Sequence, residues 1–205
     1  MPEKTMLIAQ LTDLHALPEG GTLDGLDTNA MLRTAVAHVA ALDPTPDALL
    51  LTGDLAEGGA TDSYSVLRDA LQRLSIPAYP CVGNHDDRDT FRSVFGHLPF
   101  CPSSGFIQYV IDEHPVRLIA LDTLDPGRGG GRLCSDRLDW LARKLDAEPD
   151  RPTVIFMHHP PVETGIDWMD TEFVGSRQLE RVLSERQQVR QILCGHLHRA
   201  INTSF

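Results

Sequence analysis

Histidine and acidic side chains gather in five short motifs along this chain. The motifs are Asp13-Leu14-His15, Gly53-Asp54, Gly83-Asn84-His85-Asp86, His158-His159-Pro160-Pro161 and Gly195-His196-Leu197-His198. Carboxylate, imidazole and amide oxygen ligands, with no thiolate among them, favour borderline or hard divalent ions such as Mn, Fe, Co or Zn. One such residue alone is more often a cap or a turn residue, so it is the five motifs together that predict a metal site.

Each motif follows directly on a short apolar run that is typical of a buried β-strand. The expected strands are 6–11, 48–51, 78–82, 106–111, 116–121, 153–157 and 189–194. The carboxyl ends of strands are the edge at which open α/β sheets place their ligands. Asp13 with His15, and His196 with His198, are i and i+2 pairs, so in an extended chain each pair would project to one side and chelate an ion.

Helical periodicity between these strands completes an α/β pattern. Leucines recur at spacings of three and four in two segments, around Leu67 and around Leu141, which predicts helices that pack on the sheet. Only Asp-Glu-His-Pro separates strands 106–111 and 116–121, so we expect a hairpin there and a mixed sheet. The glycine-rich stretch 126–132 lacks the spacing of a phosphate-binding loop and is expected to be a mobile surface loop.

The amino-acid composition limits the kinds of molecule that this protein is expected to bind. The 205 residues carry 18 Lys and Arg against 29 Asp and Glu, a net charge of -11, which argues against a nucleic acid duplex. A small anionic substrate would then need a local positive centre, and a metal is the more plausible source. The four cysteines form no CxxC pair, which favours a reducing, cytoplasmic setting. The apolar stretch 6–11 is too short to span a membrane.

The five motifs in this order resemble the calcineurin-like metallophosphoesterase superfamily. The segment Leu23–Ala30 and the GNHDD and MHHPP wording further resemble the bacterial class III cyclic-nucleotide and glycerophosphodiester phosphodiesterases. The resemblance runs from Met6 to the last residue. It implies a four-layer αββα sandwich with mixed sheets, formed by residues 1–205 as a single catalytic domain.

The resemblance also implies which residues hold two divalent metal ions. The first ion would take Asp13, His15 and His198, the second would take Asn84, His158 and His196, and Asp54 would bridge them. Two dications against two carboxylates leave a local charge of about +2, which would attract a phosphate ester to an acidic protein. Such a pair lowers the pKa of a shared water, so that a hydroxide attacks the phosphorus.

Further residues near the motifs receive roles by position. His85 matches the family histidine at the substrate oxygens, where it would protonate the leaving alkoxide, and Asp86 would orient it. His159 would point away from its neighbour His158 if residues 153–158 form a strand, which favours a packing or ligand-supporting role. Trp168 and Met169 would either line a substrate pocket or anchor their loop.

The leading hypothesis is a phosphodiesterase for small substrates, either glycerophosphodiesters or 3′,5′-cyclic nucleotides. The alternatives are a phosphomonoesterase, protein phosphatase or nucleotide pyrophosphatase that uses the same site, and a metal-binding scaffold without activity. Homo-oligomerisation is left open. Resembling enzymes continue beyond the last motif through further strands and often a cap, whereas this sequence stops at Phe205, so we expect a C-terminal portion to be missing.

Overall fold

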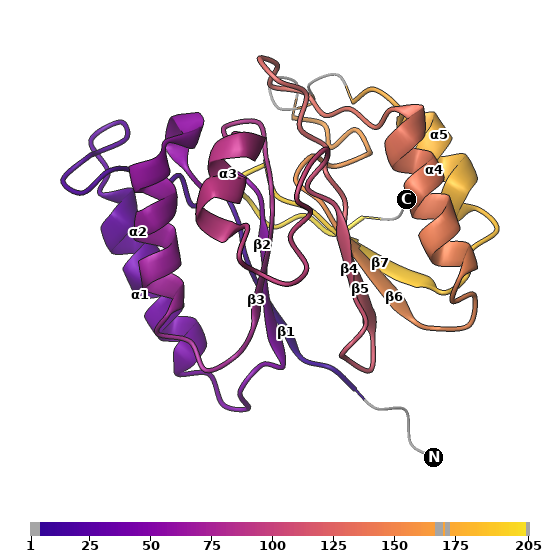
Figure 1. The fold of residues 1–205 in the computed structure, drawn as a ribbon, viewed down its shortest axis with the longest axis horizontal. Helices are drawn as coiled ribbons and strands as arrows, with labels where there is room; N and C mark the ends of the chain where they lie inside the picture. The colour runs from indigo at the N-terminus through magenta and orange to yellow at the C-terminus, as the bar shows by residue number, and fades with distance from the viewer. Residues whose placement is uncertain (1–4, 167–169, 171–172, 204–205) are drawn as a thin grey trace.

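Two β-sheets form the centre of the molecule (Figure 1). The computed structural model describes residues 5–166, 170 and 173–203. The first sheet contains parallel strands β1 (Ile8–Leu11), β2 (Ala48–Thr52) and β3 (Ala78–Cys81). The second has the order β4 (Tyr109–Ile111), β5 (Arg117–Ala120), β6 (Thr153–Phe156) and β7 (Val189–Leu193). Strand β4 runs antiparallel to β5 and the others are parallel, so the predicted hairpin and mixed sheet are confirmed.

Helices cover the outer face of each sheet (Figure 1). Helices α1 (Thr28–Ala40), α2 (Thr61–Leu71) and α3 (Arg88–Phe95) lie on the side of the first sheet, and a short 3₁₀ turn, η1 (Glu57–Gly59), precedes α2. Helices α4 (Ser135–Asp146) and α5 (Ser176–Leu183) lie on the side of the second. The layers follow the order helices, sheet, sheet, helices, which confirms the expected αββα sandwich.

Strands β5 and β6 have both faces buried, and their side chains alternate between two hydrophobic clusters. Leu118 and Phe156 join the cluster that contains the first sheet, whereas Ile119 and Ile155 join the cluster beneath α4 and α5. All four are fully buried. Because successive side chains of a strand point to opposite faces, one apolar run can hold the two sheets together and also anchor the outer helices.

Sequence periodicity predicts α2 and α4 but did not single out α1, α3 or α5. Two of these begin at an aspartate whose carboxylate accepts backbone N–H groups: Asp27 accepts from Ala30, and Asp87 accepts from Asp89 and Thr90. Such caps are a sequence signal for a helix start. Helices α3 and α5 contain only eight residues each, which leaves few repeats from which a period can be recognised.

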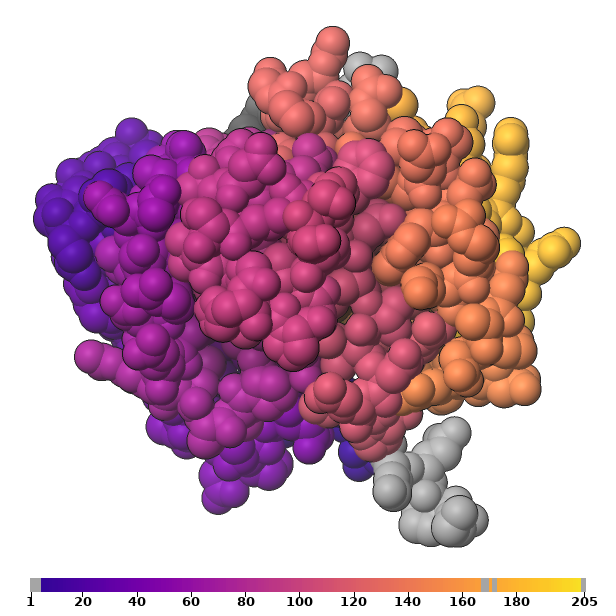
Figure 2. All heavy atoms as spheres, viewed as in Figure 1, coloured from indigo at the N-terminus to yellow at the C-terminus, as the bar shows by residue number. Residues whose placement is uncertain are grey.

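The five motifs follow the carboxyl ends of β1, β2, β3, β6 and β7. The glycine-rich stretch lies at the top of the molecule in the view of Figure 2, in salmon. Pro126 to Gly129 are exposed, as expected of a surface loop, but Gly131 packs against the side chain of His159. Trp168 and Met169 lie outside the described residues. None of the helices in the described part of the chain is long and apolar enough to cross a membrane.

Candidate metal centre

Hydrogen bonds between loops bring the strand ends of the two sheets together. The backbone N–H of Asp13 donates to Gly53 O at 3.1 Å, and that of His15 donates to Asp54 O at 2.9 Å, which joins the first two motifs. The N–H of His196 donates to both carboxylate oxygens of Asp13, at 3.0 and 3.1 Å, across the two sheets. The motifs therefore meet through direct contacts.

The residues expected around the first ion form one cluster. Ligand atoms of Asp13, His15 and His198 all lie within 4.8 Å of one another. His15 is 6% exposed, whereas the side chain of His198 is 56% exposed and its Nε2 lies 3.4 Å from Asp13 Oδ1. The cluster is therefore open to solvent on the His198 side.

The residues expected around the second ion lie beside Asp54. His158 Nε2 is 3.2 Å from Asp54 Oδ2 and 3.1 Å from Asn84 Oδ1. The rings of His158 and His196 are 5.1 Å apart between centroids. Asp54, His158 and Asp13 form a further cluster within 4.8 Å, so Asp54 lies next to one member of each expected ligand set.

Of the two i, i+2 pairs, Asp13 and His15 lie in one cluster, whereas His196 and His198 fall in different clusters, and neither pair sits in an extended chain. Asp13, His15, His196 and His198 all have left-handed backbone, with φ values of 53, 43, 73 and 52°. The N–H of Leu197 donates to Gly195 O at 2.9 Å, which closes a tight three-residue turn around His196. Backbone in this region costs about 1–3 kcal/mol per residue and persists where surrounding contacts hold it, often at functional sites.

Two glycines allow the motif loops to approach this closely. A Cβ atom at Gly53, whose φ is +88°, would lie 2.5 Å from His158 Nδ1. A Cβ atom at Gly83 would lie 2.2 Å from Asp54 Oδ1. Glycine is therefore required at both positions by contact with expected ligands, and at Gly53 also by conformation.

The donor set at these clusters fits metal ions. Each of two buried histidines has its Nδ1 next to an acceptor: His15 next to Glu57 Oε2 and His158 next to the Thr52 carbonyl, both at 2.8 Å. If Nδ1 donates in both, their Nε2 atoms carry lone pairs, and His15 Nε2 is buried with no hydrogen-bond partner. A cation between these Nε2 atoms and the nearby carboxylate and amide oxygens would be coordinated by all of them. The hydrogen bonds at Nδ1 would hold the two rings in that orientation.

Electrostatics sets the protonation of these groups. Burial opposes ionisation of Asp54, but His158 and His85 outweigh it and hold the pKa of Asp54 well below its usual range. Burial and the neighbouring His158 lower the pKa of His196 to about 4. Burial also acts against a charge on His158, yet the Asp54 carboxylate raises the pKa of His158 above its usual value. Asp54 and His196 are thus in their ligating forms at neutral pH.

Glu57 contacts two of the motif histidines, although it belongs to none of the five motifs and was not predicted to be part of the site. Its carboxylate lies 2.8 Å from His15 Nδ1 and 3.0 Å from His85 Nδ1. The backbone N–H of His85 also donates to Asp54 Oδ1 at 3.0 Å. Glu57 stands three residues after Asp54, in η1, and an acidic residue so near a motif is the signal that would have found it.

The expectation that Asp86 orients His85 is wrong. The Asp86 carboxylate is buried and accepts from the backbone N–H groups of Gly83, Leu55 and Ala56 and from the Tyr64 hydroxyl. Burial raises its pKa to about 6, although several of these hydrogen bonds oppose the shift. Asp86 thus joins the loop after β2 to the loop after β3, while Glu57 contacts the His85 ring.

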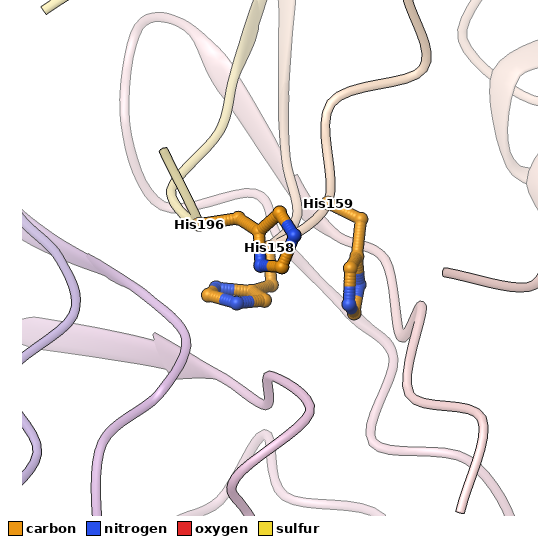
Figure 3. Close-up of side chains that lie close together, drawn as sticks. All are labelled: His158, His159 and His196. Carbon is orange, nitrogen blue, oxygen red and sulfur yellow. The ribbon is translucent and has the colours of Figure 1, made fainter. Parts of the chain in front are cut away.

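His159 is buried, as a packing role requires. Its orientation, however, does not follow from the alternation of side chains along a strand. Strand β6 ends at Phe156, so residues 157–159 lie beyond it, and the His159 ring lies beside both His158 and His196 (Figure 3). Centroid distances are 4.7 and 4.8 Å. His159 Nδ1 is 2.8 Å from the Thr123 hydroxyl. Burial and the two neighbouring histidines lower the pKa of His159 well below its usual value.

An αββα sandwich with histidine and carboxylate clusters at its strand ends is typical of metal-dependent hydrolases. The family model described as calcineurin-like phosphoesterase matches residues 6–200, and the chain belongs to this family of hydrolases.

Curated relatives cover nearly the whole chain. A probable glycerophosphodiester phosphodiesterase, GpdQ, of Arcobacter nitrofigilis is 31% identical over 201 residues, 97% of this chain and 74% of that protein. A probable cyclic nucleotide phosphodiesterase of Synechococcus sp. is 41% identical over 205 residues, 96% of this chain and 74% of that protein. The 3′,5′-cyclic adenosine monophosphate phosphodiesterase CpdA of Pseudomonas aeruginosa is 34% identical over 198 residues, with 96 and 71% covered.

Proposed function

We propose that this protein is a phosphodiesterase that hydrolyses small phosphodiesters, glycerophosphodiesters or 3′,5′-cyclic nucleotides, at a centre of two divalent metal ions. The position of Asp54 is the main support for this proposal, because its carboxylate lies close to Asp13 of the first expected ligand set and to His158 of the second. The relatives with these activities align over almost the whole chain. The unpaired state of all four cysteines supports a cytoplasmic location.

The proposed ligands are those expected from the sequence. Asp13, His15 and His198 would hold one ion, Asn84, His158 and His196 the other, and Asp54 both. When bound, the ions supply Lewis acidity and an activated water for attack on phosphorus. Mn, Fe, Zn and Co all suit this ligand set.

His85 is the proposed general acid. If its Nδ1 donates to Glu57, Nε2 is the atom that can deliver a proton, and Nε2 lies 3.9 Å from Asp54 Oδ2. The His85 side chain is 39% exposed, so a substrate can reach it. A proton donor at this point would assist departure of the alkoxide from a diester.

Two arginines stand next to the motifs: Arg199 directly follows His198, and Arg88 stands two residues after Asp86. The Arg88 guanidinium is already engaged in a two-point ion pair with Asp122, at 2.7 and 2.8 Å, which favours a diester over a monoester. A phosphate monoester carries an additional negative charge, which arginines free to bind its oxygens would stabilise. The paired Arg88 is not free in this sense.

The test compares bis(p-nitrophenyl) phosphate with p-nitrophenyl phosphate in Mn(II) buffer. We expect kcat/KM to favour the diester, and the His85→Ala variant to lose about 10²–10⁴-fold of diester activity, the usual contribution of general acid catalysis. Preference for the monoester would support the phosphomonoesterase alternative. Absence of both activities with metal bound would support an inactive scaffold.

Metal titration of chelated protein should show two steps. The second set offers a neutral amide, Asn84, where the first offers the carboxylate of Asp13, so the second ion should bind more weakly. Calorimetry with Mn(II), run beside an activity assay, should show activity mainly in the later step. Full activity after one tightly bound equivalent would contradict this order.

A further inference from the structure

Three buried histidines lie together at the motifs that follow β6 and β7: His158, His159 and His196 (Figure 3). Each offers a ring nitrogen, and these three nitrogens all lie within 4.8 Å of one another. The residues are only 0, 2 and 8% exposed. Imidazole is a ligand that suits Zn, Cu, Fe and Ni. His158 and His196 already belong to the expected second ligand set, whereas His159 belongs to neither set.

The ring of His159 has the same surroundings as the ring of the expected ligand His15. Its Nδ1 lies 2.8 Å from the Thr123 hydroxyl, which also accepts the backbone N–H of His159 at 3.4 Å. A hydroxyl oxygen has two lone pairs and can accept both hydrogens. The Nε2 atoms of His159 and His15 are both buried and have no hydrogen-bond partner. If Nδ1 of His159 donates to Thr123, its Nε2 carries the lone pair that a cation needs.

A small cavity borders this cluster at His159 and His196. Its volume is about 20 Å³, enough for one water molecule. Asp170 also lines the cavity, but its carboxylate accepts three backbone N–H groups of its own loop. The histidines are therefore the better ligands here, and the cavity has room for one further ligand that is not part of the protein.

Asn84 and His159 both lie next to His158, and they favour different metals. The amide oxygen of Asn84 is 3.1 Å from His158 Nε2, and the rings of His158 and His159 are 4.7 Å apart between centroids. Amide oxygen suits Mn(II), whereas a third imidazole suits Zn(II). Zinc sites made of three histidines and one open position are well known.

We propose that His158, His159 and His196 form a three-histidine position for Zn(II), in which His159 takes the place of Asn84 in the second ligand set. The inference rests on the metal centre proposed above. Mn(II) would use Asn84 and Zn(II) would use His159, so the identity of the metal would decide the third ligand. A purely packing role for His159 predicts no such dependence on the metal.

The first test replaces His159 with asparagine. The shorter amide keeps a polar atom near the position of Nδ1, next to Thr123, and removes Nε2. The Kd of each binding step is measured by competition with a chelator for Zn(II) and by calorimetry for Mn(II). One Zn(II) step should weaken by at least about tenfold, since residues that only support a ligand already contribute 10–100-fold to metal affinity. Both Mn(II) steps should change little.

The Asn84→Ala variant should show the opposite pattern, with a larger loss of affinity for Mn(II) than for Zn(II). His97→Asn is the matched control for the histidine substitution. His97 is exposed, its Nδ1 lies 3.0 Å from Val94 O, and it belongs to no metal-ligand cluster among the described residues. The control should keep the wild-type Kd values for both metals.

Anomalous diffraction from zinc-loaded crystals of the unchanged protein needs no variant to fold. We expect a zinc ion about 2.1 Å from His159 Nε2, the usual distance to a histidine ligand. A second zinc ion bound without His159 would overturn the inference and leave the two-ion centre intact. Equal losses of Zn(II) and Mn(II) affinity in His159→Asn, or no loss of either, would also overturn it.

These binding measurements separate the inference from the proposed function. Zinc bound at His159 in a protein that hydrolyses no phosphodiester would overturn the phosphodiesterase proposal and support the three-histidine position. Failure of the unchanged protein to bind a second ion of either metal would overturn both the two-ion centre and the inference.

Discussion

Replacing Asp54 with alanine should lower kcat/KM for a phosphodiester by at least about 10³-fold, the upper scale for losing one charge-stabilising group at a reacting centre. Asp54 is 2% exposed and lies against His158, with His15 and His85 within 4 Å of its Oδ2. Its loss would remove a proposed ligand from both ions and a negative charge from between them. Two like charges so close together would then repel strongly.

The comparison variants for Asp54→Ala are His198→Ala and Asn84→Ala, each of which removes one proposed ligand from one ion. Both should lose less activity than Asp54→Ala and retain more metal after gel filtration. Metal content per chain and kcat/KM are measured on the same samples. An Asp54→Ala protein with two bound ions and near-native turnover would show that the bridge is assigned to the wrong residue.

Replacing Glu57 with alanine should lower kcat by about 10–100-fold, the usual cost of losing a residue that orients ligands or catalytic groups. Its two carboxylate oxygens contact His15 and His85. A glutamine side chain at this position would keep a single acceptor oxygen, so Glu57→Gln should fall between wild type and Glu57→Ala. Glu148→Ala, at an exposed position after α4, is the control and should keep wild-type kcat.

A double-mutant cycle tests whether Glu57 acts through His85. In the His85→Ala background, Glu57→Ala should cost clearly less kcat than it does in the wild type, because the orientation of His85 is already lost. What remains should appear as weaker metal binding through His15, visible in calorimetry. Full additivity, with unchanged metal affinity, would leave Glu57 without a positioning role.

Part of this protein follows from local sequence alone. The seven strands, the hairpin before β5 and the two strongly periodic helices α2 and α4 were predicted within a few residues, since apolar periodicity reflects burial in each element. The motif residues were also predicted to meet, because polar residues that follow parallel strands share one sheet edge. Each of these predictions uses a signal within one short segment, so it can be made without knowing which distant segments come into contact.

The tertiary structure decided how the motif residues are oriented. Left-handed backbone at Asp13 and His15 accompanies hydrogen bonds from their N–H groups to the loop after β2, 40 and 39 residues further along the chain. Glu57, rather than Asp86, reaches His85 because Asp86 is held by backbone N–H groups and Tyr64. Both outcomes depend on contacts between loops that become neighbours only after the sheets form, and such contacts leave no period in the sequence.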